Sequence, residues 1–174
     1  MTDSFAPVIY RIDAAGRAAV FARDPRFAGE GINLNGVVVH PRGFLLVVKK
    51  SDGVLFRVPL ANPNDVSTVM VRERFVGGDG LVLSGDNELV IIANQVPTSP
   101  TNAVFSLATD DDWTSATVRE TRRLGDVYPT GGALRGDKVV VLHSRLNQLI
   151  GASPADQPNL QVEATLLELG VTGR

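Results

Sequence analysis

The sequence predicts an all-β fold, a partial β-propeller of about three blades, each built from about four antiparallel strands. The first observation is the lack of helical periodicity, since no stretch of a dozen residues keeps an apolar stripe at helical spacing. The second is that short runs of Val, Ile, Leu and Phe recur between Gly, Pro, Asn and Asp, the pattern of strands and turns. The third is that a unit of several such runs is repeated along the chain.

The repeat is clearest at its start, where a polar residue or a glycine precedes a glycine and an apolar strand follows. The first copy begins at Asn35-Gly36, the second at Asp79-Gly80, and a shorter third copy at Gly131-Gly132. In each copy a turn and a second apolar strand come next. A β-sandwich also has short strands at regular spacing, but it does not explain self-similarity that extends beyond one hairpin.

The repeat divides the single domain 1–174 into four parts. These are a partial blade at 1–30, blades at 31–76 and 77–126, and a partial blade at 127–174. The apolar pattern of 8–12 matches that of 54–58, which is the third strand of a blade. This register places Asp3 opposite Lys49, so the chain is expected to open near the end of a blade's second strand.

Each part supplies strands in order. The first partial blade has expected strands at 7–13 and 18–23. The first full blade has strands at 36–39, 44–49, 54–58 and 66–71. The second has strands at 80–83, 88–93, 103–107 and 116–121, with a proline-containing loop at 95–102. The last part has strands at 132–134, 138–143 and 161–169, and a long loop at 146–159.

About three blades fall short of the roughly four to eight that close a propeller ring. The sheets at the two ends of such a row expose strand edges and apolar faces that other blades would cover. We therefore expect a homodimer, in which the starting strands of one chain complete the last blade of the other and give a ring of about six blades.

Composition narrows the classes of partner. The 174 residues carry a formal charge of −2 with both signs interspersed, so no nucleic-acid-binding face is expected. The lack of cysteine excludes disulfides, thiolate metal sites and a cysteine nucleophile. Neither a signal peptide nor an apolar run of membrane-spanning length is found, so no membrane partner is expected. The cytoplasm is the default compartment unless a longer parent chain carries a signal.

Several conspicuous side chains have an ordinary structural interpretation. His40 lies in a tight turn and is expected to be structural. Trp113, the only tryptophan, is expected to pack between blades. The acidic run at 110–112 is interpreted as a solvated turn on the rim. The motifs of serine hydrolases, phosphate loops and zinc-binding histidine pairs are absent from the sequence.

The chain resembles the family of gluconolactonase, senescence marker protein and luciferin-regenerating enzyme, whose members are six-bladed propellers. The resemblance is carried by Thr2-Asp3-Ser4, by the stretches 34–47, 55–58 and 78–81, and by Tyr128-Pro129-Thr130. It covers most of the chain and matches the carboxyl-terminal half of such a protein. The resemblance therefore implies half of a six-bladed propeller.

The resemblance also implies a divalent-metal-dependent lactone or ester hydrolase. The Asn and Asp that bind the metal in the family fall on Asn35 and Asp79, while the family's third ligand, a Glu near its amino terminus, has no counterpart here. Ca²⁺ is the cation most expected, with Mg²⁺, Mn²⁺ or Zn²⁺ as alternatives. Such a metal would polarise the carbonyl of a small lactone or ester substrate, and Asp79 is the candidate catalytic base.

Asn35 and Asp79 both precede the innermost strand of a blade, so their side chains are expected at one mouth of the central channel. The candidate substrate-pocket residues around them are Asp3, Lys50, Asn94, Thr130 and His143. The alternative is that Asn-Gly and Asp-Gly are here simply turn dipeptides. The chain would then be a non-catalytic half-propeller that acts as a self-assembling or binding module, or a truncated fragment of a longer hydrolase.

Overall fold

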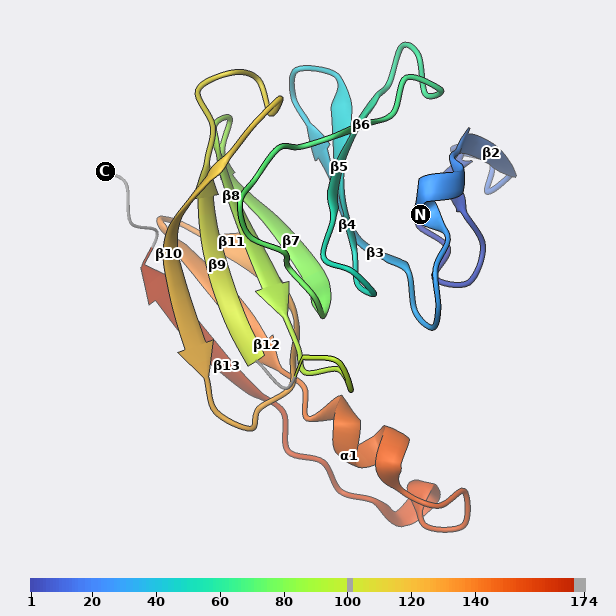
Figure 1. Ribbon diagram of the computed structural model, residues 1–174. Helices are drawn as coiled ribbons and strands as arrows, with labels where there is room; N and C mark the ends of the chain where they lie inside the picture. Colours follow the sequence, from blue (N-terminus) through green and yellow to red (C-terminus); the bar gives the residue numbers. More distant parts are fainter. Residues whose placement is uncertain (100–101, 171–174) are drawn as a thin grey trace.

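The computed structural model describes residues 1–99 and 102–170, and it confirms the all-β fold. Among these residues the strands form four antiparallel sheets, ordered β1-β2, β3-β4-β5-β6, β7-β8-β9-β10 and β11-β12-β13. The sheets follow one another in a row from the amino to the carboxyl terminus (Figure 1). Consecutive four-stranded meanders placed side by side are the architecture of a propeller, and the chain is a partial β-propeller.

The first two sheets cover the amino-terminal part of the chain. The first contains β1 (Val8–Ile12) and β2 (Ala18–Arg23), followed by the short helix η1 (Pro25–Phe27). The second contains β3 (Leu34–His40), β4 (Phe44–Lys49), β5 (Leu55–Pro59) and β6 (Ser67–Thr68). In both sheets, strands that are adjacent in sequence pair through short turns.

The other two sheets follow the same plan. The third contains β7 (Gly78–Gly85), β8 (Glu88–Ala93), β9 (Asn102–Ala108) and β10 (Thr117–Leu124). The fourth contains β11 (Pro129–Arg135), β12 (Lys138–His143) and β13 (Thr165–Gly170). The fourth sheet therefore has the first three strands of the repeat.

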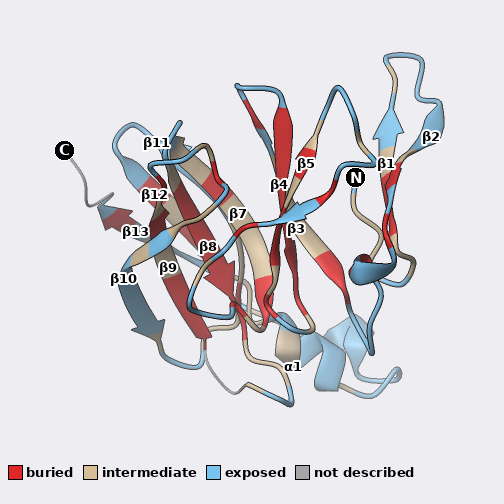
Figure 2. Cartoon of the chain, turned by 45° about the horizontal axis from the view of Figure 1, so that its top comes forward, coloured by how far each residue is buried: buried red, intermediate tan, exposed pale blue. Residues whose placement is uncertain are grey.

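Three apolar clusters hold the row of sheets together, one between each pair of neighbours. The middle strands β4 and β8 are almost wholly buried, whereas β2 and β10 at the outer edge are mostly exposed (Figure 2). Burial of both faces of β4 and β8 explains why their sequences are uninterrupted apolar runs and not alternating ones. The hydrophobic effect acts mainly between sheets, so each inner sheet depends on its neighbours.

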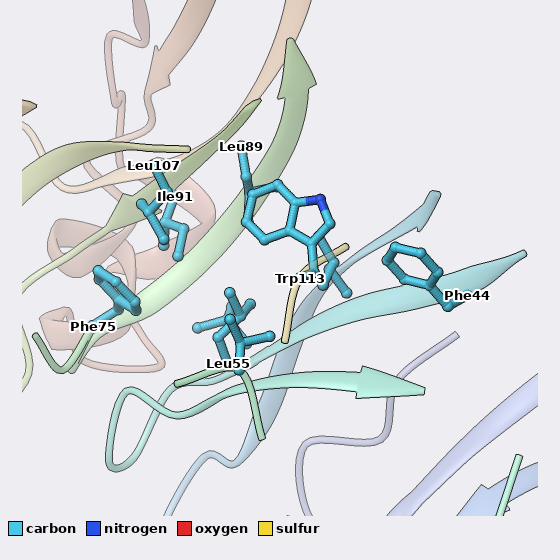
Figure 3. Packing of buried hydrophobic residues seen from close by; sticks show 10 residues of the cluster. Phe44, Leu55, Phe75, Leu89, Ile91, Leu107 and Trp113 are labelled. Carbon is cyan, nitrogen blue, oxygen red and sulfur yellow. The ribbon is translucent and has the colours of Figure 1, made fainter. Parts of the chain in front are cut away.

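Trp113 packs between the second and third sheets, as predicted. Its side chain is fully buried in a cluster with Phe44, Leu55 and Leu89 (Figure 3). Its indole Nε1 donates to the backbone oxygen of Asp86 at 3.1 Å, which satisfies the one polar atom of the ring. The tryptophan is thus a structural residue of the interface between two blades.

His40 is structural as well, as its turn position predicts. The side chain is 1% exposed and stacks on Phe44 with ring centroids 4.2 Å apart. Its Nε2 lies 2.7 Å from the same Asp86 oxygen that Trp113 contacts. At the acidic run on the rim, Asp112 forms ion pairs with Arg57 at 2.8 Å and with Arg42 at 3.0 Å.

The first sheet confirms the predicted register of the amino terminus. Asp3 N donates to Val8 O at 3.1 Å, and Lys49 N donates to Val54 O at 2.8 Å. Thr2 also forms an antiparallel bridge with Ile9. Residues 1–4 therefore take the place of the end of a blade's second strand, as the sequence repeat indicates.

Several predicted boundaries were wrong. The predicted strand 66–71 is reduced to β6, because the backbone of Met70 turns away to hydrogen-bond with Thr114 and Ala116 of the next blade. The predicted loop at 146–159 contains α1 (Leu146–Gly151) and η2 (Gln157–Asn159), which are too short for a periodic apolar stripe. The last strand begins at Thr165 and not at 161. Within the predicted loop 95–102, Asn102 belongs to β9, and residues 100–101 lie outside the described residues.

Helices are few and short. Across residues 1–99 and 102–170, none combines the length and hydropathy needed to span a bilayer.

Candidate functional site

The inner strands β3, β7 and β11 lie next to one another because glycines allow their backbones to approach closely. A Cβ atom added at Gly36 would lie 2.5 Å from the backbone oxygen of Asp79, and one at Gly80 would lie 2.9 Å from that of Thr130. Contacts this short exclude any side chain. The residues directly before these points of close approach therefore lie at the same end of neighbouring strands. They are Asn35, Asp79 and Thr130.

Lys50, Asp79 and Asn94 form a closed hydrogen-bonded triangle at this end. The Lys50 ammonium lies 2.7 Å from Asp79 Oδ2 and 2.5 Å from Asn94 Oδ1. Asn94 Nδ2 donates to the same Asp79 oxygen at 2.7 Å and to Pro129 O at 3.0 Å. Lys50 is 4% exposed and Asn94 is fully buried, so the triangle is largely shielded from water, and the Asn94 amide and Oδ2 of Asp79 are hydrogen-bonded.

We call these three residues the polar centre. The sequence predicts Asp79 as a metal ligand and the other two as pocket residues, and the structure brings all three into direct contact. They come from two neighbouring sheets: Lys50 follows β4 of the second sheet, Asp79 is the second residue of β7 in the third sheet, and Asn94 follows β8. The polar centre thus links the second and third sheets, and the Asn94 bond to Pro129 extends the link to the fourth.

Ser4 makes an equivalent link one blade earlier. Its hydroxyl donates to Leu34 O at 3.0 Å, as the amide of Asn94 does to Pro129 O. Both residues follow the second strand of a blade and reach the innermost strand of the next. Joining neighbouring blades is therefore one function of this position, and the contacts of Lys50 are consistent with it.

Tyr128 borders the polar centre and was not among the predicted site residues. Its ring centroid lies 5.9 Å from Lys50 Nζ, within cation–π range. Partial burial, and secondarily the negative charge of Asp79, raise the pKa of its phenol above 10.0. Tyr128 is therefore neutral near pH 7 and able to donate a hydrogen bond. Its backbone has φ 43°, a left-handed conformation that no sequence motif predicts.

The remaining predicted site residues are not members of the polar centre, and their positions differ. Asn35 and Thr130 are half-buried on β3 and β11. The carboxylate of Asp3 accepts hydrogen bonds from the backbone of Phe5 and Ala6 at 2.9 Å each, which lowers its pKa. It therefore serves a turn in the first sheet. His143 ends β12, where it pairs with Pro129 and Thr165.

The acidic and histidine residues give little basis for a cation site. Within residues 1–99 and 102–170, no group of three or more His, Cys, Asp or Glu is placed to hold a metal ion. Asp79 Oδ2 already accepts from an ammonium group at 2.7 Å, and a divalent cation on this carboxylate would be repelled by that positive charge. The residues present do not fit a divalent cation while Lys50 keeps this position.

Comparison with known proteins adds a fold-level likeness only. No family model and no curated protein matches the chain. Among solved structures, it is similar to selenomethionine-substituted virginiamycin B lyase from Staphylococcus aureus, at 11% sequence identity and a TM-score of 0.43. The alignment covers 97% of this chain but 64% of the other, so this chain spans less than two thirds of that protein. Its own sheets identify the chain as a partial β-propeller with a closed polar centre.

Proposed function

We propose that this chain acts as a binding module of the β-propeller type, which assembles with a second copy through the open ends of its row of sheets, and that it is not itself a hydrolase. The observation that carries the proposal is an apolar groove of about 400 Å³ between the β1–β2 hairpin and the second sheet. Its walls include Ile9, Phe21, Val37, Val39 and Leu45. An exposed apolar groove on a folded protein is a candidate interaction site.

The groove exists because the first sheet has two strands where the next has four. Part of the contact between the first and second sheets is filled by a buried apolar cluster that contains Phe27 and Leu34. Other side chains that line the groove are exposed: Val39 by 64%, Ile12 by 52% and Leu60 by 39%. Burial of such side chains by a partner would contribute about 25 cal/mol for each Å² removed from water.

The sheet at the other end of the row also presents apolar side chains. Val139 and Val141 of β12 face the third sheet, so Leu142 faces outward by the alternation of a strand. Leu166 of β13 lies directly opposite Leu142 and is 68% exposed. This pair contributes apolar surface to the outer face of the fourth sheet.

A two-fold pair of chains would cover both ends at once. The outer face of the fourth sheet of one copy would lie against the first sheet and groove of the other, and the same contact would form twice. β13 already pairs with β12 along its whole length, from Lys138↔Gly170 to His143↔Thr165. This pairing uses one edge of β13, and we propose that the end sheets of the two copies meet so that the two chains together close a ring.

Substitutions on the outer face test this proposal. In sedimentation equilibrium, the wild-type chain is expected to behave as a dimer, and Leu166→Lys is expected to shift it toward monomer by placing a charge in the contact. Leu160→Lys is the matched control, because Leu160 is also exposed but lies in the loop before β13. A dimer that is insensitive to Leu166→Lys, or a wild-type monomer, would refute the proposal.

A second candidate function is a divalent-metal-dependent lactone or ester hydrolase. The observation that favours it is the placement of Asn35, Asp79 and Thr130 at one end of three neighbouring inner strands, as their positions before Gly36, Gly80 and Gly131 indicate. The obstacle is the Lys50 ammonium on Asp79. We rank this candidate second because a cation bound there would require Lys50 to move.

A metal titration separates the two candidates. If the chain is not a metal enzyme, Ca²⁺, Mg²⁺, Mn²⁺ and Zn²⁺ leave Tm unchanged, and no lactone hydrolysis is seen. Lys50→Met removes the competing ammonium, so it is the variant in which a latent cation site would become measurable. A rise in Tm of the wild type with one cation, together with lactone hydrolysis that Asp79→Asn abolishes, would establish the hydrolase instead.

A further inference from the structure

We propose that a small phosphate monoester binds in a cavity between Arg72 and Arg74, near the outer edges of the second and third sheets. The cavity has a volume of about 450 Å³, and both arginines line it. Its other lining residues are Thr68, Val69, Met70, Val71 and Ala116. The cavity therefore brings two positively charged residues to one space that solvent can enter. It shares no residue with the polar centre or with the two end sheets.

The backbone on either side holds the two arginines in place. They belong to the segment between β6 and β7, which crosses from the second sheet to the third (Figure 1). Met70 N and O each form a hydrogen bond of 2.9 Å with the backbone of residues 114–116. Phe75 is fully buried, and its N donates to Gly53 O at 3.0 Å. Residues 71–74 are thus anchored at both ends, which lowers the entropic cost of binding a ligand there.

The positive charge of the cavity is not neutralised by the described part of the chain. Both arginines are exposed, and among residues 1–99 and 102–170 neither forms an ion pair. Glu73 lies between them in sequence but does not line the cavity. Asp111 does not line it either, and its carboxylate accepts from Ser115 N at 2.9 Å and from Ser115 Oγ at 2.7 Å. Because the whole chain has a formal charge of −2, this positive cavity is a local feature.

The main chain of the same segment adds further donors. The backbone amides of Val71, Arg72 and Arg74 form no hydrogen bond within residues 1–99 and 102–170. Guanidinium groups and free backbone amides are donors that proteins use for phosphate oxygens. A phosphate monoester carries a charge of up to about −2, which matches two arginines better than a single carboxylate does. The volume is within the range of small-molecule sites, about 300–1,000 Å³, so the organic part of an ester has room.

Titration of the wild-type chain with inorganic phosphate and with glycerol phosphate tests the site. At about pH 8, where a phosphate monoester is doubly charged, NMR of the backbone amides follows binding. Both compounds are expected to shift the resonances of residues 71–74 and to leave those of β12 unchanged. Acetate, with one negative charge, is expected to bind about tenfold more weakly. Sodium chloride at equal ionic strength is the control for general screening.

Variants of the two arginines identify the contact. Arg72→Gln and Arg74→Gln are each expected to lower the affinity for glycerol phosphate by about tenfold. Arg72→Lys keeps the charge without the planar fork and is expected to lose less. Arg122→Gln is the control, because Arg122 is exposed and pairs with Val104, which packs between the third and fourth sheets. Arg122 therefore lies on the other face of the third sheet, and its loss should leave affinity unchanged.

The outcomes decide the proposal in each case. Shifts at residues 71–74 that both glutamine variants weaken, and that Arg122→Gln does not, support the site. If neither phosphate compound shifts these resonances beyond chloride, or if Arg122→Gln weakens binding as much as Arg74→Gln, the proposal is wrong. Binding of inorganic phosphate without glycerol phosphate would also overturn it, because the ligand would not be an ester. The readout is local to residues 71–74, so failure here is distinguishable from failure of dimerisation.

Discussion

The ammonium group of Lys50 lies 2.7 Å from Oδ2 of Asp79, and this contact joins two blades of the propeller. The side chains are 6% and 20% exposed, so the pair is largely removed from water. Asn94 completes the arrangement by donating to the same oxygen. The carboxylate at the position expected for a metal ligand thus already accepts hydrogen bonds from Lys50 and Asn94. For this reason we interpret the polar centre as a link between blades.

Removing the ammonium should destabilise the fold. Lys50→Met leaves the carboxylate of Asp79 with Asn94 alone, and we expect the free energy of unfolding to fall by about 1–3 kcal/mol. Lys138→Met is the control, because its ion pair with Glu168 is mostly exposed and should contribute less than about 1 kcal/mol. Urea denaturation of both variants measures the difference. Equal losses in the two would show that the polar centre contributes no special stability.

The close approach of the inner strands predicts a steric effect. Gly36→Ala would place a methyl group 2.5 Å from the backbone oxygen of Asp79, so the strands must separate. We expect a loss of about 1–3 kcal/mol in the free energy of unfolding. Gly125→Ala, where a Cβ atom meets no atom within 4 Å, is expected to be nearly neutral. A neutral Gly36→Ala would mean that β3 and β7 do not pack as described.

The interface between the second and third sheets should depend on its tryptophan. Trp113→Ala removes a fully buried ring and leaves Asp86 O without the indole donor, and we expect a loss of about 3–5 kcal/mol. Met70→Ala, at a side chain that is 63% exposed, should change stability by less than about 0.5 kcal/mol. Thermal unfolding monitored by far-UV circular dichroism compares them. A small effect of Trp113→Ala would place this side chain outside the core.

Stability should fall when the pH drops below about 6.5 because of His143. Its pKa in the folded chain is lowered from the ordinary value of 6.5, so the unfolded chain takes up a proton that the folded chain resists. The free energy of unfolding therefore decreases from about pH 6.5 down toward the folded-state pKa. His143→Gln should remove this slope, as measured by Tm between pH 7 and pH 5. An unchanged slope in the variant would assign the effect to other groups.

The sequence repeat predicted the sheets and the position of each inner strand well, because the close approach of neighbouring backbones requires glycine at Gly36 and Gly80 of the first two copies. It also placed Lys50 and Asn94 at the ends of second strands. It did not predict that Lys50 would pair with Asp79, since the partner lies in another blade and repeat spacing says nothing of which way a long side chain points. The sequence also did not predict the left-handed backbone conformations of Tyr128 and Arg145, because neither residue is a glycine or an asparagine.

The sequence also predicted regular four-stranded blades where the chain departs from them. The segment after Pro59 has apolar residues suited to a strand, but Met70 forms its hydrogen bonds with the next blade. Local pattern cannot distinguish pairing within a sheet from pairing between sheets, because the same backbone groups serve both. The short helix α1 was not predicted for a different reason, since its six residues make fewer than two turns, which are too few to show a period.

The molar mass of the wild-type chain in solution tests the central claim most directly. Light scattering coupled to size-exclusion chromatography, on a sample shown by circular dichroism to be folded, should give about twice the chain mass of 18.5 kDa. Dilution should reduce that mass if the two open ends hold the copies together by mass action. A folded sample with the mass of one chain at every concentration would contradict the assembly of this partial propeller with a second copy.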